Sequence, residues 1–499
     1  MPRRTAATLL SILALAAPVP SGASGHSMQS VFVESFDGTR IDINVCRPAG
    51  ASADRPVPIV LTSHGWGGEK TSCLDRTGYF NAGIGFASMS QRGAGSSGGE
   101  SHVMDPDFEG RDIMAVIDHL ASLDWVLKDD GPGGTDPVLG GLGGSYGGGF
   151  QWIGAFTDQM RRGQPTRFNA LRPGNTWYDL LESLAPNGVM RTVMTTGLYA
   201  GGARSYNLAP WIHVALATSV ATGHVVDGPG PVAFASEIHQ HSAAWFVEQG
   251  HRLDIPVFVQ QGAADLVFNL NEGLHAFERA LTPSARARSI FRSNQEGHNV
   301  PAQVPGGPVP YTARGEAHCD APSELNWFRH TLLGQPLVDP SSGTYRLRTV
   351  DGACVLLDEL PALSATPSID LWPSATGPRA ASATFAPVAS GPLRVAGIPE
   401  LRFEGTASDP DARLFWGLAV GTSPETARLV GSQWMPTRVS LPAVKAPVTT
   451  ELGGIVVDVP AGQQLYLVSA PAVDQFLAHS NRTPGVILAE NVQVSLPLL

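Results

Sequence analysis

A serine framed by glycines, Gly143-Gly144-Ser145-Tyr146-Gly147, constrains the fold of this chain more than any other feature. A strand-like apolar run at 138–142 precedes it, and a helix-like stretch at 150–156 follows it. In a Gly-x-Ser-x-Gly turn the serine is strained, and its neighbours must be small because a Cβ would collide with the adjoining strand and helix. The motif predicts that the hydroxyl of Ser145 stands above a sheet edge as a nucleophile; the alternative is an ordinary glycine-rich turn.

The chain around this motif alternates strand and helix signals from residue 31 to about 334. Two strand-like runs flank Asp37-Gly38, a dipeptide typical of β-hairpins. The stretch 108–123 repeats apolar residues at helical spacing, and 324–333 reads as a closing helix. Further strand-like runs occur at 58–62, 84–91, 168–172, 256–261 and 288–292. This alternation predicts crossover connections and a parallel sheet.

Two regions depart from the alternation. The segment at about 177–250 suggests short helices without convincing strands, and we interpret it as a cap inserted over the sheet; a plain structural insertion is the alternative. After about 335, proline and glycine recur at short intervals between strand-like runs. This pattern predicts a C-terminal β-sandwich at 340–499, with the domain boundary near Val338-Asp339-Pro340.

The N-terminus is typical of an export signal at 1–23. Arg3 and Arg4 precede an apolar run at 8–19, and Ser21-Gly22-Ala23 offers small residues for cleavage. We therefore expect a secreted or extracytoplasmic protein whose catalytic domain covers 24–335; a buried N-terminal helix is the alternative. No later stretch is apolar for long enough to span a membrane. The net charge of −11 argues against a nucleic-acid partner, because phosphate binding needs a basic surface.

The chain has 4 cysteines, Cys46, Cys73, Cys319 and Cys354. Export permits disulfides, and four cysteines allow three complete pairings, which the sequence leaves open. Their spacing matches no CxxC-type metal signature, and no other cluster has metal-ligand spacing. We therefore expect neither a metal nor another cofactor.

A serine nucleophile needs a base and an orienting acid, which in this arrangement follow it in the order acid, histidine. Asp265 lies just past the strand-like run at 256–261, and His298 lies just past the run at 288–292. Both positions belong to loops at the carboxyl edge of the predicted sheet, where Ser145 is exposed. The alternatives are His318 as the base and Asp254 as the acid; Asp254 is the weaker of the two because it precedes its strand.

An oxyanion needs hydrogen-bond donors that are already in place. One predicted donor is the backbone N–H of Tyr146, directly after the nucleophile. The second is expected from His64-Gly65-Trp66-Gly67-Gly68, most plausibly at Trp66, although a simple glycine turn is the alternative. His64 precedes the serine on this loop, so we interpret it as structural.

With these motifs in place, the sequence resembles the Xaa-Pro dipeptidyl-peptidase (S15) and cocaine-esterase-like (CocE/NonD) acyl hydrolases. The resemblance implies an α/β-hydrolase fold with a helical cap, followed by a jelly-roll-like β domain, and it supports Ser145, Asp265 and His298 as the triad. Members of the group often have a tyrosine in the oxyanion loop, where this chain has Trp66. The matching segments are Asp37-Gly38-Thr39-Arg40, His64-Gly65, residues 91–99 (QRGAGSSGG), Gly144-Ser145-Tyr146-Gly147-Gly148, Asp265 and Gly297-His298.

These features predict a serine hydrolase that cleaves an ester or a peptide bond through an acyl-enzyme. The substrate is expected to be a small ester or a short peptide, including an Xaa-Pro peptide; the oligomeric state is left open. A peptidase of that kind needs a cap carboxylate to hold the substrate ammonium, and Glu182, Glu237 and Glu248 are the candidates. Two other hypotheses are a non-catalytic binding protein that keeps the fold and an acyltransferase that uses the same triad.

Overall fold

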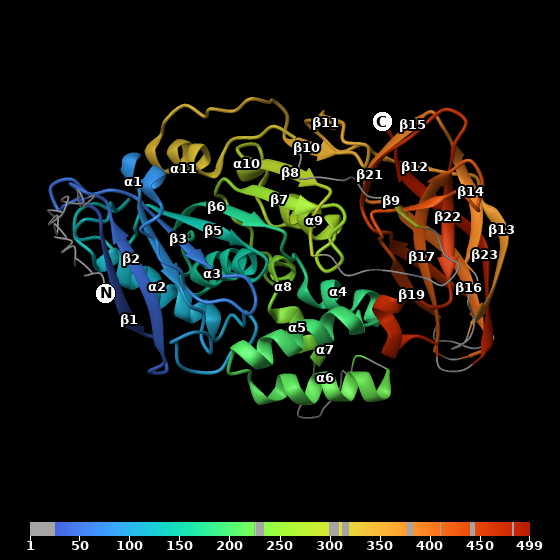
Figure 1. The fold of residues 1–499 in the computed structure, drawn as a ribbon, viewed down its shortest axis with the longest axis horizontal. Coiled ribbons are helices and arrows are strands. Elements are labelled where there is room, and N and C mark those ends of the chain that lie inside the picture. The colour runs from blue at the N-terminus through green and yellow to red at the C-terminus, as the bar shows by residue number, and fades with distance from the viewer. Residues whose placement is uncertain are drawn as a thin grey trace, which may run out of the picture.

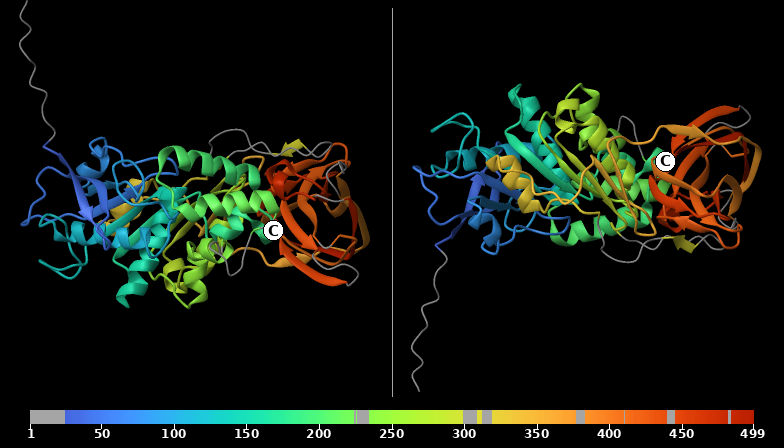
Figure 2. Two further views of the ribbon diagram at one scale, coloured as in Figure 1. Left: turned by 90° about the horizontal axis from the view of Figure 1, so that it is seen from below. Right: turned by 90° about the horizontal axis from the view of Figure 1, so that it is seen from above.

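The structure is a computed structural model that describes residues 25–223, 225, 234–298, 309–311, 319–376, 383–409, 411–439, 445–481 and 484–499. The predicted export signal at 1–23 lies outside these residues. A mixed sheet with helices occupies one end of the molecule, and a β-sandwich occupies the other (Figure 1). The end-to-end arrangement is also evident when the molecule is seen from below and from above (Figure 2). The predicted α/β class with a β-rich C-terminal part is confirmed.

The mixed sheet contains ten strands. Its first two strands form an antiparallel hairpin around the predicted Asp37-Gly38 turn. From β4 to β10 neighbouring strands run parallel, as the alternating pattern predicts. In spatial order the strands are β1 (Ser27–Glu34), β2 (Arg40–Arg47), β4 (Gly85–Met89), β3 (Ile59–Ser63), β5 (Leu139–Gly144), β6 (Phe168–Gly174), β7 (Phe258–Gly262), β8 (Ile290–Asn294), β10 (Tyr345–Arg348) and β11 (Cys354–Leu357).

Helices cover both faces of this sheet. On one face lie α2 (Glu109–Ser122), α3 (Tyr146–Arg162) and α9 (Leu270–Arg279); on the other lie α1 (Thr77–Asn81) and α11 (Glu324–Leu333). The short α10 (Pro283–Arg286) joins α9 to β8. The helical stripe predicted for α2, formed by Ile113, Val116, Ile117 and Leu120, is fully buried.

The mixed sheet extends further along the chain than predicted. Strands β10 and β11 lie within the predicted C-terminal domain at 340–499, yet β10 pairs with β8 and β11 pairs with β10. The boundary near Val338 is therefore too early, because the open edge of β8 offers backbone hydrogen bonds that the sequence pattern does not reveal. Conversely, β9 (Val309–Tyr311) precedes the predicted boundary in the sequence, yet it pairs with β18 (Arg428–Val430) of the C-terminal sandwich.

The region at 177–250 between β6 and β7 is helical, and its helices lie across the sheet end that carries Ser145 (Figure 1). Two of them, α5 and α6, are longer than the short helices expected from the sequence. The elements are α4 (Leu180–Leu184), η1 (Pro186–Gly188), α5 (Thr192–Ser205), α6 (Pro210–Thr222), α7 (Phe234–Gln240) and α8 (Ala243–Glu248). Residues 224 and 226–233 of this region lie outside the described part.

The C-terminal part consists of two facing sheets with a two-strand ribbon, and its described strands pair antiparallel except for the parallel pair of β18 and β9. Its core includes the buried Trp372 and Trp416. One sheet contains β12 (Leu363–Ala365), β23 (Gly485–Pro497), β16 (Glu400–Ala407), β20 (Ala446–Glu451) and β13 (Ile369–Thr376). The other contains β14 (Thr384–Ser390), β22 (Gln464–Ala470), β17 (Ala412–Gly421), β18 (Arg428–Val430), β9 and β19 (Met435–Val439); the ribbon is β15 (Leu393–Gly397) with β21 (Ile455–Val459).

Buried hydrogen bonds attach the sandwich to the cap. His479, at the end of η2 (Asp474–His479), is fully buried. Its Nδ1 accepts the N–H of Met190 at 3.0 Å, and its Nε2 donates to the carbonyl of Ser219 at 3.0 Å. The guanidinium of Arg413 donates to the carbonyl of Gly223 at 2.7 Å. Because these groups would be costly to leave unpaired, the sandwich fixes the outer cap helices.

Two disulfides resolve the pairing that the sequence left open. Cys46 is bonded to Cys73, and Cys319 is bonded to Cys354. The first ties β2 to the loop after β3, and the second ties the segment before α11 to β11. Among the described residues, no helix has the length and apolar character needed to cross a bilayer.

Glycines allow the start of α3 to approach the end of β3. A Cβ on Gly147 would lie 2.5 Å from the carbonyl oxygen of Ser63 and 3.1 Å from that of His64. Gly143, with φ of +154°, faces the same crossing, because its Cβ would lie 2.5 Å from the carbonyl oxygen of Gly147. Backbone atoms cannot swing aside as side chains can, so the crossing requires glycine at both positions.

Substitution of Gly147 by alanine is therefore expected to destabilise the protein by about 1–3 kcal/mol, as overpacking against immovable neighbours does. The measurement is the shift in thermal unfolding relative to wild type. Gly201→Ala in α5 is the control, because a Cβ there meets nothing within 4 Å and alanine favours a helix. Equal unfolding temperatures for Gly147→Ala and Gly201→Ala would contradict the steric argument.

Candidate active site

The predicted nucleophile lies at the turn between β5 and α3. Ser145 has φ of 56° and ψ of −123°, a strained combination for a residue with a side chain. Its backbone N–H donates to the carbonyl of Gly174 on the neighbouring β6 at 2.8 Å, and this bond helps to hold the turn. The N-terminus of α3 lies directly behind the hydroxyl, so its partial positive charge favours negative charge that develops there.

The predicted acid follows β7 in a buried loop. Asp265 is fully buried, and its Oδ1 accepts the backbone N–H groups of Val267 at 2.8 Å and Phe268 at 2.9 Å. Its Oδ2 lies 2.7 Å from Nδ1 of His298. A carboxylate held by two backbone donors keeps a fixed orientation, so one oxygen always faces the imidazole.

The predicted base follows β8 and links the other two side chains. Nε2 of His298 lies 2.9 Å from Oγ of Ser145. Since the carboxylate of Asp265 can only accept, Nδ1 carries the proton and Nε2 is free to accept the hydroxyl proton of Ser145. Gly297 permits the approach, because a Cβ there would lie 2.3 Å from Cβ of Asp265. The structure thus brings together three residues from three distant loops.

Two opposing effects set the pKa of His298. Burial alone lowers this pKa, because an imidazolium is poorly solvated there, but the hydrogen bond and the charge of Asp265 outweigh burial. The pKa of His298 therefore lies above its ordinary value of 6.5. An imidazole tuned in this way accepts a proton more readily than a free histidine does.

The alternative candidates for the acid and the base do not lie beside Ser145 where the structure describes them. Asp254 is exposed and pairs with Arg288 at 3.2 Å, ahead of β7 at the opposite end of that strand from Asp265. His318 lies outside the described residues. Nε2 of His64 accepts the N–H of Gln91 at 3.0 Å, and burial lowers the pKa of this histidine. His64 therefore lies in the loop as a neutral structural side chain.

The two residues predicted to supply oxyanion donors, Tyr146 and Trp66, line the same cavity as Ser145. Tyr146 is the first residue of α3, where backbone N–H groups have no partner within the helix. Trp66 lines the same cavity as Ser145, but its indole N–H donates to the carbonyl of Leu198 in α5 at 2.7 Å. The indole thus fastens the cap to the loop at 64–68, which leaves only the backbone of Trp66 as the predicted donor.

Tyr206, at the end of α5, holds the same loop, and the sequence did not single it out. Its hydroxyl accepts the N–H of Gly67 at 2.6 Å and lies 3.3 Å from the carbonyl oxygen of Gly65. Its ring also packs edge-on against Trp66, with centroids 4.7 Å apart. A tyrosine in a cap helix carries no local motif, so only its spatial contacts reveal this function.

Gln433 is a second contributor that the sequence did not reveal. This buried glutamine of the sandwich donates through Nε2 to the carbonyl of Asp265 at 2.9 Å. The neighbouring Gly431 approaches the backbone of Ala263 so closely that a Cβ would lie 3.1 Å from its carbonyl oxygen. The C-terminal part therefore packs directly against the loop that carries Asp265.

An apolar cavity opens onto Ser145 beneath the cap. Among the described residues that line it there is no carboxylate and no basic side chain. The sheet domain contributes Val103 and Phe268, and the region at 177–250 contributes Trp177, Leu180, Leu198, Trp211, Ile212, Leu216 and Ile238. A cavity of this composition favours an uncharged, apolar group next to the nucleophile.

Several solved structures share this architecture over nearly their whole length. A CocE/NonD family hydrolase from Staphylococcus aureus has a TM-score of 0.64 at 14% identity, covering 95% of this chain and 94% of that chain. An aminopeptidase from a marine sediment Thaumarchaeota archaeon has a TM-score of 0.62 at 12% identity, covering 98% and 99%. An alpha-amino acid ester hydrolase has a TM-score of 0.60 at 13% identity, covering 97% and 100%. At these identities the likeness establishes the fold.

The family assignment rests on the sequence and not on the likeness of folds. Comparison with curated protein sequences gives no match. The sequence model of the X-Pro dipeptidyl-peptidase (S15) family matches residues 37–293, just over half of the chain, and confirms the resemblance inferred from the motifs. This protein therefore belongs to the X-Pro dipeptidyl-peptidase (S15) family and is a serine hydrolase.

Proposed function

We propose that this protein is an exported esterase that cleaves esters of uncharged, apolar carboxylic acids through an acyl-enzyme on Ser145. The observation that carries the proposal is the hydrogen-bonded series from Ser145 to His298 to Asp265, at 2.9 and 2.7 Å. Ser145 attacks the ester carbonyl while His298 takes its proton and then delivers it to the leaving alcohol. Water, activated by the same imidazole, releases the acid and restores the serine. The N–H of Tyr146 and the backbone of Trp66 stabilise the oxyanion.

The cavity supports an ester in preference to an Xaa-Pro peptide. A peptide with a free amino terminus would place an ammonium in the cavity, and a buried ammonium needs a carboxylate partner. None of the three cap glutamates lines the cavity beside Ser145. Oε2 of Glu182 accepts the N–H of Asn187 at 3.1 Å, Glu248 pairs with His239 at 2.9 Å, and Glu237 faces His241 at 3.9 Å.

Export is supported by the sequence at 1–23 together with the two disulfides. Disulfides persist in oxidising compartments and are rare where thiols are kept reduced. Both cross-links attach the catalytic sheet to neighbouring loops, so they stabilise the half of the molecule that carries Ser145.

A fluorophosphonate probe tests the nucleophile directly. We expect wild type to be labelled and Ser145→Ala to remain unlabelled, because the probe reacts only with an activated serine hydroxyl. Ser96→Ala, which removes an exposed serine of the same domain, is the control and should be labelled like wild type. A folded wild-type protein that the probe does not label would favour the hypothesis of a non-catalytic binding protein instead.

The pH profile tests the base and the acid together. Protonated His298 cannot accept the proton of Ser145, so kcat/KM should fall as the pH drops through a pKa above 6.5. Asp265→Asn removes the charge that raises this pKa and leaves burial, which lowers it. The profile of that variant should shift to lower pH, and its plateau should fall by at least about a hundredfold.

Asp254→Asn is the matched control for this experiment, because it removes a carboxylate that lies outside the proposed relay. Its profile should overlay that of wild type. An Asp265→Asn profile that keeps both the wild-type midpoint and the wild-type plateau would exclude Asp265 as the acid.

A matched pair of substrates tests the specificity. The p-nitrophenyl esters of butyric acid and of 2-aminobutyric acid share a carbon skeleton and differ by one ammonium. We expect kcat/KM to be at least about tenfold higher for the butyrate, because the ammonium loses water without gaining a partner. Ala-Pro p-nitroanilide should be cleaved far more slowly than either ester. Preference for the amino ester or the dipeptide substrate would refute the apolar specificity.

A further inference from the structure

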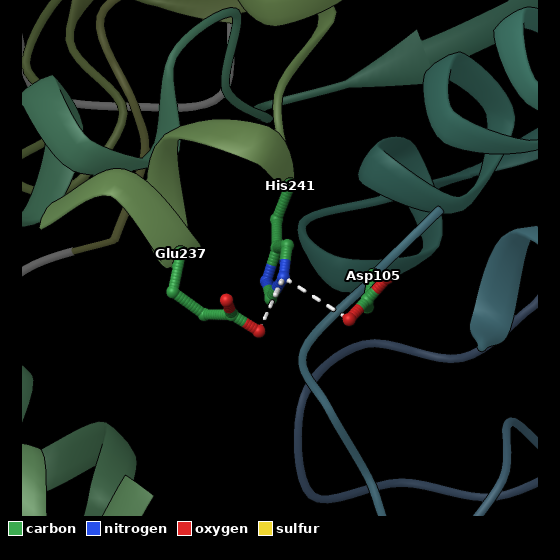
Figure 3. A group of neighbouring side chains, drawn as sticks. All are labelled: Asp105, Glu237 and His241. Atoms are coloured by element: carbon green, nitrogen blue, oxygen red, sulfur yellow. Dashed lines mark ion pairs between the residues drawn. The ribbon is translucent and has the colours of Figure 1, made fainter. Parts of the chain in front are cut away.

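A group of three side chains bridges the cap and the catalytic domain outside the proposed relay. Glu237 lies in α7, His241 follows that helix by one residue, and Asp105 lies in the loop before α2 (Figure 3). One ligand atom of each lies within 4.8 Å of the others. The spacing of Glu237 and His241 is four residues, which places both side chains on one face of a helical turn.

The distances around His241 do not fit an ordinary hydrogen-bonded histidine. Its Nε2 points toward both carboxylates, at 3.6 Å from Oδ2 of Asp105 and 3.9 Å from Oε1 of Glu237 (Figure 3). Both separations exceed the hydrogen-bond range of about 2.7–3.2 Å. The ring is only 1% exposed, and its Nδ1 has no hydrogen-bond partner among the described residues. A buried imidazole thus faces two carboxylates at ion-pair distance but beyond hydrogen-bond distance of either.

A neighbouring histidine shows a hydrogen-bonded ion pair in the same cap. Nδ1 of His239 lies 3.0 Å from Asp179, and its Nε2 lies 2.9 Å from Glu248. Each nitrogen of His239 therefore has its own carboxylate at hydrogen-bond distance. In contrast, a single nitrogen of His241 faces two carboxylates, and neither lies at hydrogen-bond distance.

We propose that Asp105, Glu237 and His241 form a divalent transition-metal site, of the Zn²⁺ or Mn²⁺ type, that fastens the cap to the catalytic domain. Zn²⁺ bonds of 2.0–2.2 Å at tetrahedral angles place neighbouring ligand atoms about 3.4 Å apart, close to the separations of 3.6 and 3.9 Å. One imidazole nitrogen with two carboxylate oxygens is a donor set that Zn²⁺ and Mn²⁺ accept. The proton of His241 then lies on Nδ1, which leaves the lone pair of Nε2 for the ion.

The surrounding bonds leave the proposed ligand atoms available. Oδ1 of Asp105 accepts the N–H of Asp107 at 2.6 Å, which orients Oδ2 toward His241. The carbonyl of His241 accepts the indole N–H of Trp177 at 2.8 Å. Trp177 also lines the cavity beside Ser145, as does Ile238 from α7. An ion at the site therefore stabilises one wall of the cavity as well as the junction of cap and core.

Calorimetric titration of the tag-free protein with ZnCl₂, after removal of metals with EDTA, tests the site. We expect one Zn²⁺ per chain and a rise in unfolding temperature of a few degrees at saturating metal, because the ion binds only the folded arrangement. Glu237→Gln should weaken Zn²⁺ binding at least about tenfold and abolish the rise. Glu237 is partly exposed, so this substitution leaves the core intact, and circular dichroism verifies the fold.

Glu248→Gln is the matched control, since it removes a carboxylate from the other histidine of the same cap. Its Zn²⁺ affinity and its thermal shift should equal those of wild type. A titration with MnCl₂ follows the same design and is expected to show the same dependence on Glu237. Absence of stoichiometric binding of both ions, or binding that survives Glu237→Gln unchanged, would overturn the proposal. Neither readout depends on turnover, so this outcome is separate from that of the esterase proposal.

Discussion

The contact between the first turn of α3 and the end of β3 is the constraint on which the site depends. That contact exists because residues 143 and 147 have no Cβ, and it forces Ser145 into a backbone conformation that lifts its hydroxyl above the sheet. Parallel strands end at a common edge, so the loops after β7 and β8 arrive at the same place. Asp265 and His298 therefore meet Ser145 without any local sequence relation to it.

The C-terminal sandwich stabilises the two parts of the site that the sheet alone leaves unsupported. Gln433 holds the backbone of Asp265, and His479 holds the outer helices of the cap. Each contact pairs a buried polar atom that would otherwise lose water without compensation. The sandwich is thus a structural partner of the loop that carries Asp265 and of the cap.

The sequence predicted the residues whose position follows from where a strand ends. Ser145, Asp265 and His298 could be located because each follows a recognisable apolar run at the carboxyl edge of the sheet. Contacts between distant segments gave no such signal. The bond from Tyr206 to Gly67, the bond from Gln433 to Asp265 and the pairing of β10 with β8 depend on three-dimensional proximity. The predicted domain boundary failed for the same reason, since a strand pattern does not say which sheet a strand will join.

The ionisable side chains that attach the cap to the sheet domain lie away from the apolar cavity. Glu272 is buried and accepts the N–H groups of Tyr178 and Asp179, each at 2.8 Å, and burial raises its pKa to about 8. His239 joins Asp179 to Glu248 on the same side of the cap. None of these four ionisable side chains is among the described residues that line the cavity. The polar attachments of the cap therefore lie outside the space that faces Ser145, and a charged substrate group entering that space finds no described partner of opposite charge.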